Sequence, residues 1–261
     1  MLSIAELRKR NPILNALGLL HLGLAAVMLV LMLIDNTQVL GVNRWMKPFK
    51  FDVSVAIYAF TFAWISYYLP PKWTRRISRQ IALCMLLEIT LVTLQAARGV
   101  KSHFNRESID GGIIYAVMGI FIMYNTVLVL LITIKFFRLS FDLPKLYLRG
   151  IQLGLVSFLL GSFMGMYMSS SPGHTVGAID GGPGLPFLNW STQFGDLRVM
   201  HFIGLHGLQI FIITGVWLAY RSNFSEKLQL RILYIFFCIF VALIFITFCQ
   251  ALQASPLISM P

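Results

Sequence analysis

Residues 13–34 read ILNALGLLHLGLAAVMLVLMLI, a stretch of 22 residues without a charged side chain. A helix rises about 1.5 Å per residue, so a helix of this length crosses the roughly 30 Å hydrocarbon core of a bilayer. The stretch is longer than the apolar region of a secretory signal, and no small-residue cleavage site follows it. We therefore interpret it as a membrane span and not as a cleaved leader.

Six further stretches of 19 to 22 mostly apolar residues are long enough to cross a membrane: 51–69, 80–98, 113–134, 151–169, 199–220 and 232–253. A transmembrane β-barrel needs alternating segments of about 10 residues, and these stretches do not alternate. The sequence predicts an all-α integral membrane protein, a seven-transmembrane-helix bundle that forms a single domain over residues 1–261.

The composition excludes two other classes of protein. Apolar residues make up 57% of the chain, charged residues only 12%, and the mean hydropathy is +0.77. A soluble domain carries about 25% charged residues, and a disordered chain has low hydrophobicity. The net charge of +11 would suggest nucleic acid in a soluble protein. Here apolar spans separate the basic clusters, so we expect membrane lipids and no nucleic acid as partners.

The basic residues also predict an orientation. Arg8, Lys9 and Arg10 precede the first stretch and place the N-terminus in the cytoplasm. With the loops then assigned to alternate sides, 14 of the 21 Lys and Arg residues fall on the cytoplasmic side. The prediction is a cytoplasmic N-terminus and an extracytoplasmic C-terminus in a bacterial cytoplasmic (inner) membrane. We call the extracytoplasmic side the outer face.

The longest predicted loop, 170–198, lies on the outer face. Its 29 residues include six Gly and three Pro, together with Phe187, Trp190 and Phe194. Long loops without regular structure are commonly functional, and the aromatic residues argue against disorder. We expect a compact lid over the outer end of the bundle, and a function at that face.

Polar residues in the third stretch form the strongest candidate site. Glu88 lies near the middle of the span, Gln95 follows seven residues later on the same face, and Arg98 stands at the outer boundary. Ionisable side chains inside a membrane are costly and are typical of functional sites. The alternative is an interhelical clamp in which Glu88 bonds to Asn125 or Gln152.

Four of the five histidines map to the outer loops or to the outer half of the sixth span: His103, His174, His201 and His206. Imidazole ligates metals and moves protons near neutral pH. His201 and His206 lie about 140° apart around a regular helix, so a shared site needs a kink. We therefore consider these four as ligands of a metal ion or haem, with Glu88, Arg98 and His103 as catalytic residues.

Further polar residues on the outer side are candidates for substrate binding: Lys47, Lys50, Gln95, Asn105, Asp180, Asp196 and Gln209. For Lys47 and Lys50, which we place in the loop after the first span, the alternative is that they snorkel to the interface beside Trp45. The fifth span carries Gly150, Gly154, Gly161 and Gly165 on one side, which predicts close helix packing.

Three functions remain open. The first is a membrane-embedded enzyme or redox protein that holds a metal ion or haem and acts on a lipid- or quinone-like substrate. The alternative is a carrier or receptor for a small anionic ligand, with Glu88 as a proton-coupling group. The third is a scaffold or assembly factor. Phosphate-binding, dinucleotide-binding and zinc-protease motifs do not occur in the sequence.

The stretches LQAARGVKSHFN, GHTVGAIDGGPGLP and GDLRVMHFIGLHGLQ resemble those of a family of bacterial multi-pass membrane proteins without an assigned activity. The resemblance covers the outer loops from about Gln95 onward. It implies a bacterial membrane origin and carries no reaction or cofactor with it.

Overall fold

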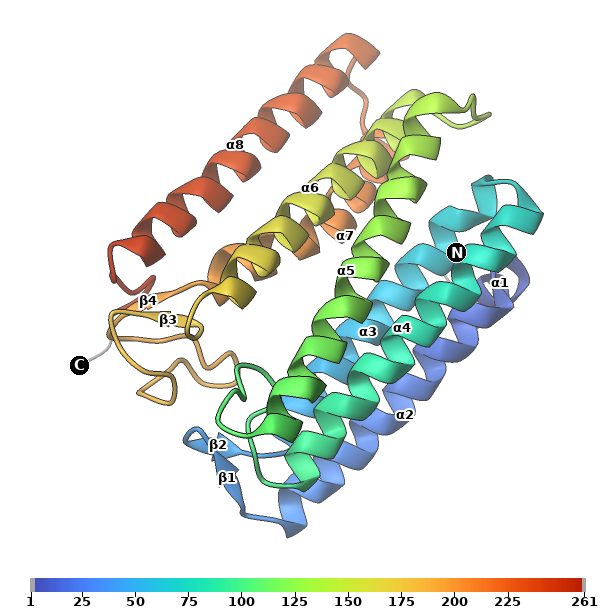
Figure 1. The fold of residues 1–261 in the computed structure, drawn as a ribbon. Coiled ribbons are helices and arrows are strands. Elements are labelled where there is room, and N and C mark those ends of the chain that lie inside the picture. The colour runs from blue at the N-terminus through green and yellow to red at the C-terminus, as the bar shows by residue number, and fades with distance from the viewer. Residues whose placement is uncertain (1–2, 260–261) are drawn as a thin grey trace. The chain divides into compact units, whose positions relative to one another are not determined.

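A computed structural model describes residues 3–259, which contain eight α-helices and two short antiparallel strand pairs (Figure 1). The helices are α1 (Ile4–Arg10), α2 (Pro12–Ile34), α3 (Met46–Ile65), α4 (Pro71–Ala97), α5 (Ile109–Arg138), α6 (Lys145–Ser170), α7 (Arg198–Arg221) and α8 (Glu226–Leu252), and a 3₁₀ turn, η1 (Ser66–Tyr68), follows α3. The strands β1 (Gln38–Val39) and β2 (Val42–Asn43) form one antiparallel pair, and β3 (Thr175–Val176) and β4 (Gly195–Asp196) form the other.

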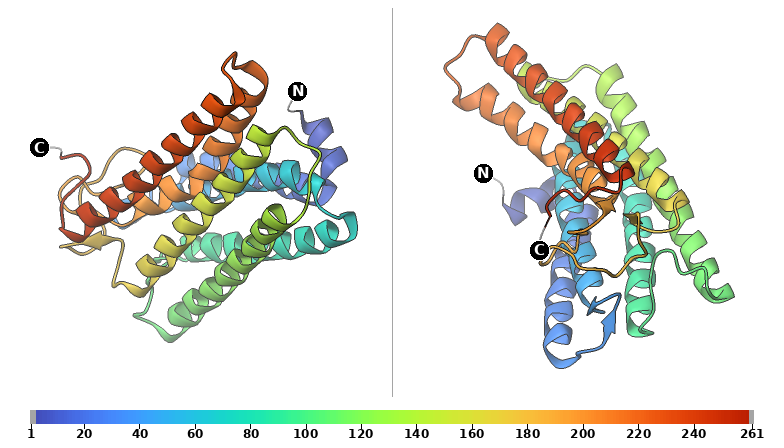
Figure 2. Two further views of the ribbon diagram at one scale, coloured as in Figure 1. Left: turned by 90° about the horizontal axis from the view of Figure 1, so that it is seen from above. Right: turned by 90° about the vertical axis from the view of Figure 1, so that its left-hand side faces the viewer.

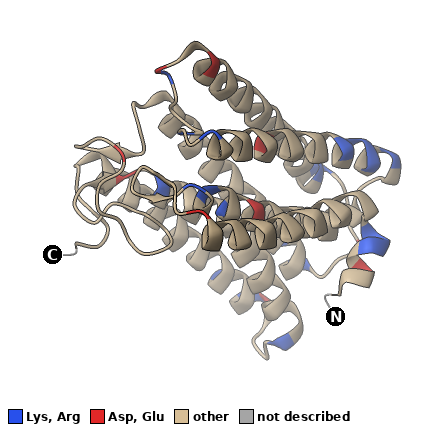
Figure 3. Ribbon diagram, turned by 90° about the horizontal axis from the view of Figure 1, so that it is seen from below, with Lys and Arg blue, Asp and Glu red and all other residues tan. Residues whose placement is uncertain are grey.

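Seven of the described helices, α2 to α8, are long and apolar enough to cross a membrane. The prediction of seven spans in a helical membrane protein is thus confirmed. Lys and Arg residues, blue in Figure 3, gather toward the ends of the helices, where water or lipid head groups can solvate their side chains. The described residues do not include Met1, Leu2, Met260 and Pro261. The prediction of the side on which each chain end lies concerns these residues.

All seven long helices begin before the apolar stretches that predicted them. The α3 helix begins at Met46, so Lys47 and Lys50 stand on its first turns and not in a loop. The α4 helix begins at Pro71 and continues through a charged segment before the hydrocarbon section starts. Lys and Arg are good helix formers, and proline fits the first turn of a helix. Hydropathy marks only the part of a helix that lies in lipid.

The chain forms two compact units, residues 1–128 and 129–261, and α5 passes from the first into the second. In the first unit α2 packs along α3, and α4 packs on both (Figure 2). The side-chain amide of Asn11 donates to Ser66 Oγ (3.0 Å) and Ser78 Oγ (2.7 Å), which ties the start of α2 to η1 and α4. Tyr58 of α3 donates to Asn125 of α5 at 3.0 Å.

In the second unit α6 and α7 run in close contact. A Cβ added at Gly150 would lie 3.0 Å from Gly215 Cα, and one at Gly154 would lie 2.8 Å from the main-chain oxygen of Leu208. The predicted glycine face therefore packs on α7, as small residues do between membrane helices. On its other side α7 packs on α8 through Phe211 and its aromatic neighbours.

Candidate functional site

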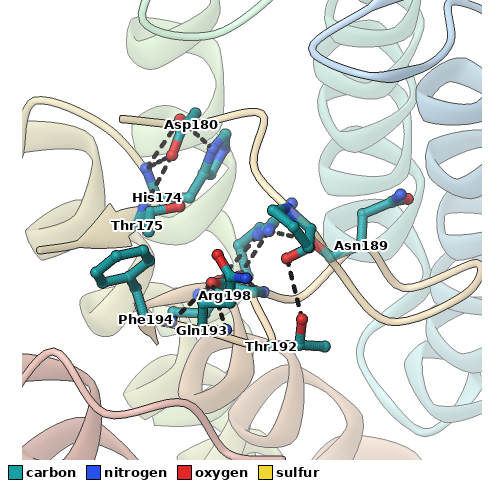
Figure 4. A network of polar contacts seen from close by, with 11 residues as sticks. His174, Thr175, Asp180, Asn189, Thr192, Gln193, Phe194 and Arg198 are labelled. Atoms are coloured by element: carbon teal, nitrogen blue, oxygen red, sulfur yellow. Dashed lines mark hydrogen bonds and ion pairs between the residues drawn. The ribbon is translucent and has the colours of Figure 1, made fainter. Parts of the chain in front are cut away.

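The 171–197 loop of the second unit is folded around two carboxylates (Figure 4). Asp180 accepts hydrogen bonds from the main-chain N–H groups of His174 and Thr175, and its Oδ2 lies 2.7 Å from His174 Nδ1. Burial opposes ionisation of Asp180, but the hydrogen bonds and the charge of His174 outweigh it and hold its pKa well below the ordinary range. An ionised Asp180 therefore organises the first half of the loop.

Asp196 organises the second half. It accepts from Ser191 N–H at 2.8 Å, and Arg198 donates to both of its oxygens, at 2.9 Å from Nε and 2.6 Å from Nη2. The same guanidinium donates to the main-chain oxygen of Asn189. The loop thus has regular structure, the β3–β4 pair included. The two carboxylates that we proposed for substrate binding both hold the loop's own backbone.

The two histidines of α7 have local contacts within the second unit. His201 Nδ1–H donates to the main-chain oxygen of Gly161 at 2.7 Å. The His206 ring packs on Phe202, with 4.3 Å between ring centroids, and Phe202 in turn packs on Trp190 at 5.4 Å. Gln209 lies half-buried about one turn after His206. His201 and His206 interact electrostatically although they are five residues apart.

The four proposed metal ligands are divided between the two units. His103 belongs to the first unit, whereas His174, His201 and His206 belong to the second. Within residues 3–259, no group of three or more His, Cys, Asp or Glu side chains is placed to hold a metal ion. Structural and catalytic sites for zinc need at least three such ligands.

The first unit holds a different group of polar residues, at the end that carries the β1–β2 hairpin and the 98–108 loop. We call it the hairpin end. Asp35 accepts from Trp45 Nε1 at 2.7 Å and from Arg44 Nε at 2.6 Å, and Arg44 Nη1 donates to the main-chain oxygen of Ala97 at 3.0 Å. Hydrogen bonds from Thr37, Trp45 and Arg44 hold the pKa of Asp35 well below its usual value. An ionised Asp35 therefore fastens the hairpin to the end of α4.

Glu88 and His103 approach each other in the first unit. His103 Nε2 lies 3.9 Å from Glu88 Oε1, and the other ring nitrogen lies 3.0 Å from Ser102 Oγ. Glu88 is only 3% exposed, and its Oε2 has no hydrogen-bond partner among the described residues. Lys47 of α3 is close enough to interact with it electrostatically. A buried carboxyl group therefore lies near an imidazole and an ammonium group.

Gln95 and Arg98 continue the polar face of α4 toward its end. Arg98 Nη1 donates to Gln95 Oε1 at 3.0 Å, and its Nη2 pairs with Asp110 at the start of α5. Gln95 is fully buried, and among the described residues its side-chain nitrogen has no hydrogen-bond partner. Arg98 keeps 40% of its side chain exposed. The polar stripe predicted from the spacing runs from a buried Glu88 to a solvent-accessible Arg98.

Aromatic rings pack around His103, beside these polar residues. Phe51 packs edge-on to His103 at 5.6 Å between centroids, with the Lys47 ammonium 5.8 Å from the Phe51 ring centre, and Tyr115 lies 6.0 Å from His103. We define the hairpin-end site by its polar residues: Lys47, Glu88, Gln95, Arg98 and His103.

Four other candidates have different surroundings. Asn105 is buried, and its side chain packs on Gly111 of α5. Lys50 lies half-buried on α3. The amides proposed as clamps for Glu88 bond elsewhere: Asn125 to Tyr58, and Gln152 to Arg149 at 2.7 Å and to the main-chain oxygen of Phe136 at 2.8 Å.

One pair was not predicted. His21 of α2 and Asp52 of α3 lie 2.6 Å apart between Nδ1 and Oδ1, with side chains 1% and 0% exposed. The signal was present in the sequence, because Asp52 is the second residue of the 51–69 stretch and every ionisable residue in a span is a candidate.

Comparison with known proteins adds no assignment. No family model, no curated protein and no solved structure matches the chain.

Proposed function

We propose that the hairpin-end site binds a small ligand through an anionic or carbonyl oxygen and exchanges a proton with it. The observation that carries this proposal is the position of Glu88, a buried carboxyl group 3.9 Å from His103 and on the same helix face as Gln95, to which Arg98 donates. Arg98 and Lys47 supply positive charge for a ligand oxygen. Glu88 and His103 supply groups that gain and lose a proton.

The distance between Glu88 and His103 supports a shared oxygen. At 3.9 Å the two atoms are too far apart for a direct hydrogen bond. An oxygen atom placed beside both can still lie within hydrogen-bond distance of each. Phe51 and Tyr115 give the same place apolar walls, which suits a lipid- or quinone-like molecule as well as a small organic anion.

Of the functions that the sequence left open, a carrier or receptor for such a ligand fits this site best. Its cations and its titratable groups all lie in the first unit, where α3, α4 and the 98–108 loop position them. In this function Glu88 couples ligand binding to a proton. The predicted orientation places the site at the extracytoplasmic face of a bacterial inner membrane.

A binding measurement tests the proposal. Decanoate and decyl-ubiquinone serve as probes of the anionic and the carbonyl-bearing class, added to the protein in lipid nanodiscs. A ligand at about 100 times its dissociation constant stabilises the folded state by roughly 2.7 kcal/mol. We expect at least one probe to raise the midpoint of thermal unfolding. The shift is expected to disappear in Arg98→Ala and to become independent of pH in Glu88→Gln.

The matched control is Arg138→Ala, because Arg138 is exposed at the far end of α5 from Asp110. This variant is expected to keep the full shift. If Arg98→Ala keeps the shift too, and the shift in Glu88→Gln depends on pH as it does in the unaltered protein, the site does not bind the probes and the proposal fails. In proteoliposomes, a carrier accumulates labelled probe in response to a pH gradient, whereas a receptor binds it without transport.

A metal- or haem-dependent enzyme is the second candidate, and one observation favours it. His201 donates its Nδ1–H to a carbonyl oxygen, which is how histidines that ligate a metal through Nε2 are commonly oriented. Metal analysis and an absorption spectrum of protein purified without chelator test this candidate. A stoichiometric metal or a haem band that is lost in His201→Ala would support it, and their absence in the unaltered protein would exclude it.

A further inference from the structure

We propose that His21 and Asp52 form a second proton-binding site, inside the membrane-spanning part of the first unit, that takes up and releases one proton. This site is separate from the hairpin-end site, and the inference does not depend on a ligand binding there.

The contact between the two side chains determines which ring nitrogen of His21 carries a hydrogen. His21 Nδ1 lies 2.6 Å from Asp52 Oδ1, and both side chains are buried. With the carboxylate as acceptor, the ring carries its hydrogen on Nδ1. His21 Nε2 and Asp52 Oδ2 are also buried, and within the described residues neither has a hydrogen-bond partner. His21 Nε2 is therefore the atom at which a further proton can bind.

The charge of the pair depends on that proton. A neutral imidazole beside a carboxylate carries one net negative charge. A proton added at Nε2 gives an imidazolium–carboxylate pair with no net charge, and no bond between heavy atoms changes. A lone charge in the membrane interior is costly, so the proton is held until a change in the surrounding charge or polarity favours its release.

Other titratable groups of the first unit define these surroundings. Tyr58 on α3 and Cys84 and Glu88 on α4 are buried, whereas Tyr115 on α5 and His103 are half-buried. Lys47 and Lys50 lie on the same helix as Asp52, at its hairpin end, and Arg10 of α1 lies at the opposite end of α2. Three of these groups, Glu88, Lys47 and His103, belong to the hairpin-end site. A change in charge there is one event that can alter proton binding at His21 and Asp52.

A purely structural role does not need titratable groups. In the same unit, neutral side chains join the helices, through Asn11 with Ser66 and Ser78, and through Tyr58 with Asn125. A buried ion pair is commonly no more stabilising than apolar residues of similar size. Buried His, Asp and Glu groups in membrane helices are typical of proton transfer in pumps and transporters. A role in proton binding therefore explains the buried pair better than a role in stability.

Nitrogen NMR of the protein tests the proposal directly. The full chain, labelled with ¹⁵N at histidine, is placed in lipid nanodiscs and titrated with acid and base, and His21→Gln assigns the His21 signals. We expect the Nε2 signal to change from a bare nitrogen to N–H in one single-proton step, while Nδ1 keeps its hydrogen throughout. In Asp52→Asn, proton binding at Nε2 should weaken at least tenfold, because the carboxylate no longer stabilises the imidazolium.

Two outcomes would overturn the proposal. One is a His21 Nε2 signal that stays in a single state over the whole pH range in which the protein remains folded. The other is an unchanged titration in folded Asp52→Asn. The first outcome is measured on the unaltered protein, so it can be tested even if Asp52→Asn fails to fold. The double variant His21→Phe with Asp52→Leu adds a second measurement, because it should bind one proton fewer in a potentiometric titration. An unchanged proton count would contradict the assignment.

Discussion

His201 Nδ1 donates to the main-chain oxygen of Gly161 at 2.7 Å. This bond joins α7 to α6 at the level where Gly161 and Gly204 bring the two backbones together. Lipid gives membrane helices no hydrophobic reason to associate, so close packing of small residues and interhelical hydrogen bonds supply the attraction. In the second unit, close glycine packing and an interhelical hydrogen bond hold α6 and α7 together at the same level.

Alanine at Gly161 should therefore destabilise the second unit. Its Cβ would lie 2.5 Å from Leu205 N and 2.6 Å from Gly204 C, both backbone atoms that cannot rotate away. We expect a loss of about 1–3 kcal/mol, the usual cost of overpacking. The measurement is thermal or SDS-induced unfolding in mild detergent. Gly119→Ala is the control, since no atom lies within 4 Å of its added Cβ. Equal stability of the two variants would show that α6 and α7 pack less closely.

The 171–197 loop should lose its order when Asp180 loses its charge. Because the folded-state pKa of Asp180 lies below the ordinary value, its stabilisation is complete above that value, about pH 4. It is lost as the pH falls from there toward the folded-state pKa. At neutral pH, Asp180→Asn should increase hydrogen exchange at His174 and Thr175 at least tenfold. Asp142→Asn, at an exposed loop position, should leave exchange there unchanged. Unaltered protection in Asp180→Asn would contradict the role that we assign to the carboxylate.

The sequence predicts the spans well because the lipid sets one simple requirement, about 20 apolar residues in a row. It predicts helix ends poorly, because helices continue through Lys and Arg into the head-group region, as α4 does from Pro71. Periodicity places Glu88 and Gln95 on one face of α4, and both are buried.

Contacts between distant segments are harder to predict. The loop carboxylates Asp180 and Asp196 bind mainly neighbouring backbone, and their partners follow from the folded path of the loop. His21 and Asp52 are 31 positions apart, on helices whose pairing the sequence does not specify. Residue type and depth identify such groups as costly, but only the packing of α2 on α3 makes them a pair.

The orientation of the chain remains a prediction that reporter fusions can test. A fusion after Ser171 should place the reporter outside, and a fusion after Ser222 should place it in the cytoplasm, because α7 lies between them. Alkaline phosphatase should be active only in the first fusion, and a green fluorescent protein should fluoresce only in the second. The reverse result would move the hairpin-end site to the cytoplasmic side.

Arg10 should stabilise the first unit by more than its charge. Its guanidinium lies 3.8 Å from the centre of the Trp64 ring, donates to the Glu6 carboxylate at 2.8 Å and donates to Tyr68 Oη at 3.1 Å. Lysine keeps the charge but loses the planar group that stacks and bonds at once. Arg10→Lys should therefore cost about 1 kcal/mol in unfolding free energy, in keeping with a partly exposed cation–π contact. Arg8→Lys is the control, because Arg8 is exposed. If both variants unfold like the unaltered protein, Arg10 contributes only to orientation.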